Sequence, residues 1–400
     1  MRAIRHIQIF WKLAFAAIVW SGLNAALAQT QYSITDVGTL GGYNSVPNWI
    51  TNTGDVIGVS DTGQFDNFGN SIQHAFRWSK GVMQDLGTAG DVNSIAVGGN
   101  DEGASVGWNW YNINHALMWY KDSVADLGTL IGPGGASEAL QINDAGQIAG
   151  VSYAADGTFH AVLWNQGMIH DLGTYGVPNT NSVAFGINDR GQVVGVAQLN
   201  DVVDPILGFP DYYGTLWDHG EIVNLTAGTP GDAFNINNKS QVVGRLLLPD
   251  AIEGGVAHAY LWQEGALTDL GVPAGDDNSE ANSLNNNGQI VGDSGVGFIE
   301  TYTPDHALLW QNGAWSDLNT LIPPNSGYYL IVASDVNARG QIVVWAVNVN
   351  TGNVHAALLS PQPSNLTPGK AGNAHQTAPH LSANAQRLLT LVRTRLHSKR

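Results

Sequence analysis

The 400-residue sequence contains no cysteine. Disulfide staples, thiol catalysis and cysteine-ligated zinc are therefore excluded, and stability must come from packing alone. Basic residues are also scarce, because the stretch from Gln29 to Leu359 holds 33 acidic side chains but only 7 basic ones. Such a body repels nucleic acid backbones and anionic lipid headgroups. We therefore expect no nucleic-acid partner and favour cationic or basic partners.

Long apolar runs are lacking as well. The run from Leu13 to Leu23 follows three basic residues and is too short for a comfortable membrane span. Ala26-Leu27-Ala28 then fits the small-residue cleavage rule, so residues 1–28 are predicted to be a cleaved secretory signal, with a retained anchor as the alternative. No later run is long enough to span a membrane. We expect a secreted, extracellular protein, with the periplasm or the cell surface as other possible locations.

Glycine is abundant instead, and 49 glycines beside 44% hydrophobic residues suit many short strands joined by tight turns. A unit seen in full from His160 to Gly173 recurs along the chain. Its first half opens on a His-Ala pair, at His74, His115, His160, His258, His306 and His355. Its second half is Asp-Leu-Gly or a variant, starting at Asp36, Asp85, Asp126, Asp171, Asp269 and Asp317. Within each copy, the constant spacing of eleven residues between the two halves indicates one rigid unit.

A second unit, typified by Ile142-Asn-Asp-Ala-Gly-Gln-Ile-Ala-Gly150, precedes the first in each repeat. Asn at the first turn position, followed by a Gly that tolerates positive φ, is typical of a tight hairpin. Trp164-Asn-Gln-Gly-Met168 follows the same pattern. Each repeat therefore holds two hairpins, whose strands we name a, b, c and d. The a–b and c–d turns barely change in length, so length variation is confined to the b–c and d–a connections.

Seven copies of a four-stranded unit of about 47 residues predict an all-β, seven-bladed β-propeller over residues 29–359. The ends favour a closed ring. Tyr32 to Val37 is a d strand with no a, b or c before it, and His355 to Leu359 is a c strand with no d after it. The N-terminal strand is expected to complete the last blade and remove a free sheet edge. A stacked β-solenoid is the alternative, and we expect a monomer.

These residues resemble a known group. His74-Ala-Phe-Arg-Trp78, Asp36-Val-Gly-Thr-Leu-Gly-Gly42 and the Ile-Asn-x-x-Gly-Gln units are similar to the repeats of HAF-family extracellular proteins, a class of bacterial secreted repeat proteins. The resemblance covers residues 32–359. It implies an exported bacterial repeat protein and brings no established activity or catalytic residues with it.

The repeated His and Asp side chains could suggest metal or acid–base sites. A group copied into nearly every blade is distributed around the ring, whereas catalysis needs different groups in one place. We therefore interpret them as structural pairs, and we interpret the repeated Trp residues as core between blades rather than as sugar-stacking platforms. No catalytic residue is predicted.

The candidate ligand-contact residues lie outside the repeated positions. They are Trp108, Trp110, Tyr111, Tyr153, Asp201, Asp204, Phe209, Asp211, Tyr212 and Tyr213. Most belong to the fourth blade, where Tyr213 replaces the His, the b–c connection is expanded, Asn224 replaces the Asp, and Ser240 then replaces a turn Gly in the fifth blade. A recognition loop and neutral drift explain these departures equally well.

No cofactor is predicted, although calcium remains open because Asp276, Asp277 and Glu280 form a loose acidic group. A solvated acidic loop is the alternative. Beyond the repeats, residues 360–381 are rich in Pro, Asn, Gly and Ala and predict a flexible linker. The basic tail at 382–400 could form a short amphipathic helix or remain frayed.

The sequence thus favours a non-catalytic binding scaffold for an extracellular protein or glycan. The ligand is expected on the face of the b–c and d–a connections, over the channel, and to be cationic, calcium-bridged or a polar glycan. The alternative is a hydrolase or lyase that acts on an extracellular polymer with carboxylates and His at the channel mouth.

Overall fold

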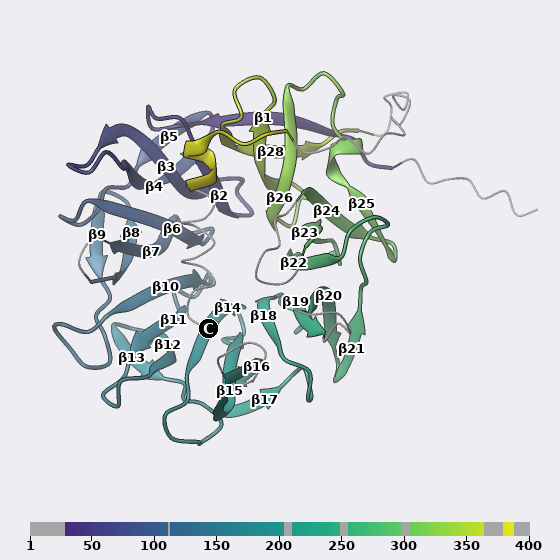
Figure 1. Cartoon of the computed structure of the whole chain (residues 1–400). Coiled ribbons are helices and arrows are strands. Elements are labelled where there is room, and N and C mark those ends of the chain that lie inside the picture. The colour runs from purple at the N-terminus through teal and green to yellow at the C-terminus, as the bar shows by residue number, and fades with distance from the viewer. Residues whose placement is uncertain are drawn as a thin grey trace, which may run out of the picture.

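The chain forms seven four-stranded antiparallel sheets arranged in a ring (Figure 1). The structure, a computed structural model, describes residues 29–110, 113–203, 210–248, 255–297, 305–363 and 379–387. The predicted signal segment 1–28, most of the predicted linker, and the candidates Tyr111, Asp204 and Phe209 lie outside these ranges. Within the described ranges no helix is long and apolar enough to cross a membrane. The predicted seven-bladed β-propeller is confirmed.

Each blade runs from an inner strand beside the channel to an outer strand at the rim. The inner, a strands are β2 (Ser45–Ile50), β6 (Asn93–Gly99), β10 (Ser137–Ile142), β14 (Ser182–Ile187), β18 (Gly231–Ile236), β22 (Asn278–Leu284) and β26 (Tyr328–Val336). The b strands are β3 (Val56–Phe65), β7 (Ala104–Trp110), β11 (Ile148–Tyr153), β15 (Val193–Val203), β19 (Val242–Leu248), β23 (Ile290–Gly295) and β27 (Ile342–Asn348).

The outer half of each blade is the hairpin that carries the His and Asp positions. The c strands are β4 (Ser71–Ser79), β8 (His115–Tyr120), β12 (Phe159–Asn165), β16 (Pro210–Asp218), β20 (Val256–Gln263), β24 (His306–Gln311) and β28 (Val354–Pro361). The d strands are β5 (Val82–Asp85), β9 (Ser123–Asp126), β13 (Met168–Asp171), β17 (Glu221–Asn224), β21 (Ala266–Asp269), β25 (Ala314–Asp317) and β1 (Tyr32–Gly38). One short 3₁₀ helix, η1 (Leu318–Thr320), follows β25.

The ring is closed by strands from the two ends of the chain. β1 pairs antiparallel with β28, with Tyr32 opposite Pro361 and Asp36 opposite Ala357, so the last sheet runs β1-β28-β27-β26. This is the closure expected from the unpaired d and c strands at the ends of the repeats. It leaves every blade with four strands and hides the edge of β28.

Alternation of the strands gives the propeller two different faces. We name the face with the a–b and c–d turns the turn face, and the face with the b–c and d–a connections the variable face. The turns are tight because a residue near each tip adopts positive φ, as Gly146 and Gly167 do. Ser240 takes the same conformation without being glycine, at φ 59°.

A β-bulge lies in every inner strand, near the end that meets the turn face. The pairing register of the seven a strands shifts at the same place, between Pro47/Trp49, Ala96/Gly98, Ala139/Gln141, Ala184/Gly186, Ala233/Asn235, Ala281/Ser283 and Ala333/Asp335. A bulge redirects the side chain that follows it. The residue after each bulge is therefore positioned differently from a regular inner-strand residue.

Apolar side chains between neighbouring sheets form the core. One cluster lies across the a and b strands of the last, first and second blades and includes Trp108, Trp110, Tyr329 and Trp345. The C-terminal segment 379–387 joins this cluster through Ala385, which is fully buried, and through Leu381. Its short helix, residues 383–387, is the yellow element beside β2 in Figure 1. The described part of the tail is thus packed against the ring.

Candidate functional site

The repeated His and Asp side chains pair within each outer hairpin. The Nδ1 atom of the His lies 2.7–2.9 Å from the Asp Oδ2 atom in His74–Asp85, His115–Asp126, His160–Asp171, His258–Asp269 and His355–Asp36. In each pair, Oδ1 of the Asp accepts the backbone N–H two residues later, for example that of Gly173 from Asp171. The Asp therefore stabilises the turn that follows the d strand, and the hydrogen bond from the His fixes the orientation of the Asp side chain.

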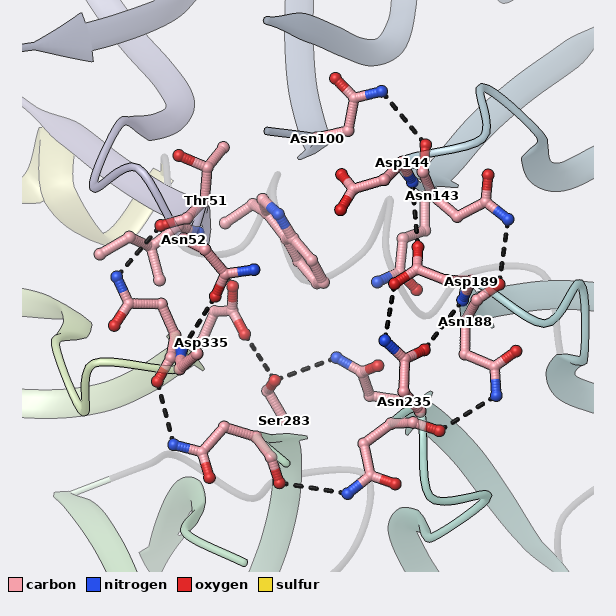
Figure 2. Close-up of a pocket in the computed structure, with 18 of the residues that line it drawn as sticks. Thr51, Asn52, Asn100, Asn143, Asp144, Asn188, Asp189, Asn235, Ser283 and Asp335 are labelled. Atoms are coloured by element: carbon pink, nitrogen blue, oxygen red, sulfur yellow. Dashed lines mark hydrogen bonds between the residues drawn. The ribbon is translucent and has the colours of Figure 1, made fainter. Parts of the chain in front are cut away.

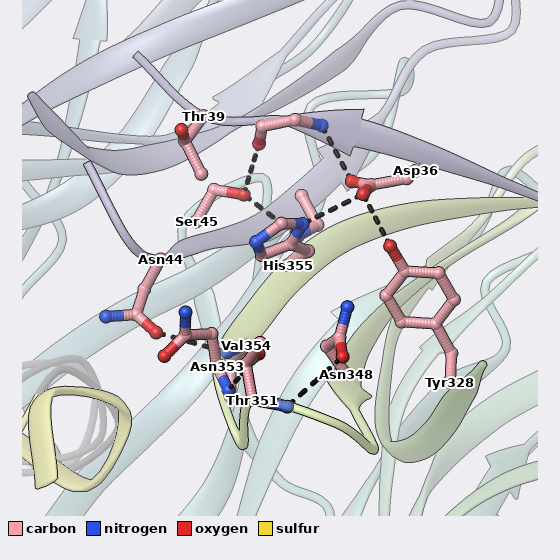
Figure 3. Close-up of polar contacts among 12 residues, drawn as sticks. Asp36, Thr39, Asn44, Ser45, Tyr328, Asn348, Thr351, Asn353, Val354 and His355 are labelled. Atoms are coloured by element: carbon pink, nitrogen blue, oxygen red, sulfur yellow. Dashed lines mark hydrogen bonds and ion pairs between the residues drawn. The ribbon is translucent and has the colours of Figure 1, made fainter. Parts of the chain in front are cut away.

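The closing pair shows the same arrangement across the two ends of the chain (Figure 3). Asp36 on β1 accepts from Tyr328 and pairs with His355 on β28. Burial opposes ionisation of Asp36, but these hydrogen bonds prevail and lower its pKa to about 2. The His–Asp unit thus helps to hold the ring shut.

Two blades depart from this pattern. His306 lies 3.3 Å from Asp276 of a neighbouring loop, and Asp317 instead caps η1 by accepting from the Asn319 N–H. The hydrogen bond to Asp276, opposed by partial burial, raises the pKa of His306. In the fourth blade Tyr213 and Asn224 replace the pair. The His and Asp side chains are spread around the ring and do not converge on one point.

A serine at the start of the inner strand ties each of five blades to the blade before it. Its Oγ donates to the carbonyl of the Asp-x-Gly glycine and accepts, at 2.9–3.1 Å, the N–H after the His position. These serines are Ser45, Ser94, Ser137, Ser182 and Ser279. Between the sixth and seventh blades, Asn319 bonds both polar groups of the Leu330 backbone instead.

Two further departures from the repeat, Gly214 and Gly231, lie at the seam between the fourth and fifth blades. Gly231 stands where the serine is expected, and Gly214 stands where the other His-Ala pairs place Ala. A Cβ atom on Gly214 would lie 3.0 Å from the hydroxyl of Tyr260, a fully buried side chain of the next blade. The small residue at 214 therefore makes room for the large one at 260.

At the turn face, a belt of amide hydrogen bonds links the inner strands around the channel (Figure 2). The Asn of each Ile-Asn motif uses Oδ1 to cap its own turn and Nδ2 to reach the backbone carbonyl of the next blade at 2.9–3.1 Å. The six donors are Asn100, Asn143, Asn188, Asn237, Asn285 and Asn337. Thr51 holds this position in the first blade, where it receives the last bond of the series.

The residue after each of these positions forms a second belt, at the channel mouth. Its backbone N–H donates to the side chain of its counterpart in the next blade, from Asn52 through Asp101, Asp144, Asp189 and Asn238 to Asn286, and again from Ala338 to Asn52. Three consecutive carboxylates result. Burial, together with the charges of Asp101, Asp189 and Glu102, raises the pKa of Asp144. This arc of the mouth is thus acidic.

Inside this mouth lies a cavity of about 130 Å³. Side chains that differ from blade to blade line it at the position that follows the inner-strand bulge: Trp49, Gln141, Asn235, Ser283 and Asp335. Asn235 Nδ2 lies 3.0 Å from Ser283 Oγ, which donates to Asp335 Oδ1 at 2.5 Å. Asp335 Oδ2 also accepts the Ile50 N–H at 2.9 Å. Burial raises the pKa of Asp335 to about 6 despite these bonds.

These lining residues were not among the contact residues predicted from the sequence. A signal was present, since the residue directly before each Ile-Asn motif is irregular within an otherwise regular unit. Only the bulge and the ring closure reveal that these positions from different blades meet. The arrangement can bind a small polar or cationic group. Its lining holds one inner carboxylate, Asp335, and three carboxylates at the mouth, and it includes no lysine, arginine or histidine among the described residues.

The predicted contact residues take different positions. Trp108 and Trp110 are buried on β7 within the cluster that Ala385 joins, and Tyr212 is buried on β16 against Val151 and Val196. Tyr153 and Asp201 are exposed on the variable face. Asp211 and Tyr213 lie half-buried on β16. The expanded connection of the fourth blade is largely an extension of the β15–β16 hairpin, with Val203 paired to Pro210.

The three acidic residues considered for calcium bind other groups of the protein. Glu280 is buried and pairs with Arg245, which also bonds Asp232 at 2.7 Å. Asp276 accepts from Ser294 at 2.5 Å, and Asp277 accepts from the Gly297 N–H at 3.3 Å. Among the described residues no group of three or more His, Asp or Glu side chains is placed to hold a metal ion.

Some solved structures have a propeller similar to that of this chain. No protein-family model matches this chain, and no curated protein sequence matches it. Among solved structures, it is similar to the β-propeller domain of the Trilobed protease from Pyrococcus furiosus, described with an open velcro topology (TM-score 0.51, 7% identity, 83% of this chain and 99% of that chain). It is also similar to a puromycin-hydrolysing peptidase from Mycobacterium tuberculosis (TM-score 0.50, 11% identity, 86% of this chain).

The present chain spans only 57% of that peptidase. At such low identities, the likeness shows the propeller fold alone.

Proposed function

We propose that this chain is an exported repeat protein of the HAF type that binds an extracellular protein or glycan through its variable face, without catalysing a reaction. One observation carries the proposal. The b–c connections of six blades each present a large apolar side chain to solvent, namely Phe65 and Phe68, Ile113, Tyr153, Val202, Val296 and Val349. The seventh of these connections, at 249–254, lies outside the described residues.

Exposed apolar side chains on loops around one face are typical of a recognition surface. They stand among carboxylates such as the half-buried Asp66 and the exposed Asp156 and Asp201. Aromatic and aliphatic groups beside acidic groups suit a partner with both apolar and basic or hydroxyl-bearing parts. The binding interpretation is further supported by the His, Asp and Ser side chains of the repeat, which are engaged in the bonds that hold the blades.

A binding experiment with the full chain tests this proposal. The protein is applied to an array of glycans and of extracellular-surface extracts, with calcium and with EDTA. A double variant, Phe68→Ser with Tyr153→Ser, is expected to weaken binding at least tenfold. The matched control is Val82→Ser, because Val82 is 69% exposed but lies on the turn face. Equal losses in both variants, or turnover of a bound polysaccharide, would contradict the proposal.

A further inference from the structure

The cavity at the turn face is separate from the variable face and has its own chemistry. Its lining includes four carboxylates, Asp101, Asp144, Asp189 and Asp335, and no lysine, arginine or histidine among the described residues. Charges of one sign around a confined space with protein walls concentrate the opposite charge there. The cavity therefore favours a cation over a neutral or anionic molecule.

Asp335 is the innermost of these carboxylates and is only 2% exposed. It accepts hydrogen bonds from Ser283 and from the backbone N–H groups of Ile50 and Val336. Among the described residues, no cationic side chain forms an ion pair with Asp335. A buried charge is ordinarily paired with an opposite charge, because hydrogen bonds alone recover only part of the lost hydration. A bound cation would supply the missing charge.

Gln141 gives an independent indication of a ligand. This side chain is 6% exposed and lines the cavity. Its Oε1 accepts the Ile187 N–H at 2.8 Å, whereas its Nε2 has no hydrogen-bond partner among the described residues. This Nε2 is not one of the fully enclosed unpaired atoms of the described residues, so it is open to the cavity, where an amide N–H normally finds an acceptor. A group with acceptor atoms in the cavity would satisfy this one.

The neighbouring positions are shaped around Gln141. The two blades on either side carry glycine at the equivalent position. A Cβ atom on Gly98 would lie 2.9 Å from the Gln141 Cα, and one on Gly186 would lie 3.1 Å from the Gln141 Oε1. Glycine at 98 and 186 therefore leaves space on both sides of Gln141. Of the three adjacent positions 98, 141 and 186, only 141 carries a polar side chain into the cavity.

We propose that the turn-face cavity is a binding site for a small organic ammonium compound, with Asp335 as its counter-charge and Gln141 as a donor to a polar group of the same molecule. The volume of about 130 Å³ limits the ligand, since a cavity of about 150 Å³ accommodates benzene. Trp49, which also lines the cavity, offers an aromatic side chain of the kind that binds alkylated ammonium groups.

Calorimetric titration of the full chain at constant ionic strength tests this site. The probes are ammonium, methylammonium, propylammonium and tetramethylammonium chlorides, with 1-propanol and sodium propionate as the neutral and anionic counterparts of propylammonium. We expect one-to-one binding of at least one organic ammonium and no binding of 1-propanol or propionate. Asp335→Asn is expected to weaken that binding at least tenfold, whereas the control Asp156→Asn, on the variable face, leaves it unchanged.

Circular dichroism checks that Asp335→Asn is folded. If it is not, Asn235→Phe, which fills the cavity and keeps the carboxylate, takes its place and is expected to abolish binding. The proposal is overturned if none of the four cations binds saturably, which would mean that the cavity holds water alone. It is equally overturned if 1-propanol binds as tightly as propylammonium, or if the folded cavity variant binds like the wild type. None of these results bears on the variable face.

Discussion

Asp335 is a buried carboxylate whose ionisation the fold opposes. Burial raises its pKa from 3.8 to about 6, so the folded chain holds this proton more tightly than the unfolded chain does. The free energy of unfolding should therefore fall as the pH rises from about 4 to about 6. Above that range the whole loss, about 3 kcal/mol, applies.

Asp335→Asn removes this ionisable group. Compared with the wild type, we expect the variant to gain up to about 3 kcal/mol more in the free energy of unfolding at pH 8 than at pH 4. Urea denaturation at the two pH values measures the difference. The exposed Asp122, changed to Asn, is the control. A difference no larger for Asp335→Asn than for this control would show that the cavity is well hydrated.

Ser240 is a second residue whose cost is visible only in the structure. It holds a left-handed conformation, with φ at 59°, where the other six blades have Gly. Its hydroxyl compensates in part, since it donates to Gln192 at 2.7 Å and accepts from Arg190 at 3.2 Å. The departure that the sequence marked as recognition or drift is thus accommodated within the turn.

Ser240→Gly should stabilise the protein by about 0.5–1 kcal/mol. It relieves the cost of a left-handed residue with a Cβ atom, roughly 1–2 kcal/mol, and the loss of two hydroxyl contacts offsets part of this gain. The reverse change, Gly146→Ser, is the matched test at φ 79° and should destabilise by about 1 kcal/mol. Thermal unfolding of both variants measures these effects. Changes of the same sign would refute the argument.

At the scale of elements, the seam between β16 and β20 depends on paired sizes. Gly214 on β16 allows the buried Tyr260 of β20 to approach. Gly231 at the start of β18 also has no room for a side chain, since an added Cβ atom would lie 2.5 Å from the Arg245 carbonyl oxygen. The sequence revealed that this blade differs but not that its differences face one another. Their meeting depends on how neighbouring sheets stack.

Gly214→Ala is expected to destabilise by about 1–3 kcal/mol through overpacking against Tyr260. Adding Tyr260→Leu, which restores the residue size found in the sixth blade at Leu308, should recover the part of that loss caused by Tyr260, while the contact of the added Cβ with Thr226 Cγ2 at 2.9 Å remains. A double-mutant cycle from chemical denaturation gives the coupling energy between the two positions. Additive effects would mean that the residues do not touch.

For the whole molecule, stability depends on closing the ring. β1 contributes the buried Tyr32 and Val37, a ladder with β28 and the Asp36–His355 pair. Deleting residues 29–38 removes all of these and exposes the edge of β28. The burial of the two apolar side chains alone corresponds to roughly 3–6 kcal/mol.

This deletion should lower the melting temperature markedly and broaden the transition, as the last blade frays first. Calorimetry on the deletion variant, beside a control that lacks only Gln29 and Thr30, distinguishes loss of closure from loss of chain length. A melting curve that stays sharp and unshifted would mean that the ring holds without its closing strand.

The sequence by itself determined the number of blades, the four strands in each and the closure by β1, because these follow from local turn chemistry and from a repeat that is copied seven times. It also indicated that the His and Asp side chains are distributed rather than convergent. Tertiary structure alone decided that Trp108, Trp110 and Tyr212 are buried, because their burial depends on how sheets stack and on where residues 379–387 pack. It also decided that Gln141, Asn235, Ser283 and Asp335 share one cavity, since residues from about 50 to about 190 positions apart meet only when the inner strands surround a common axis.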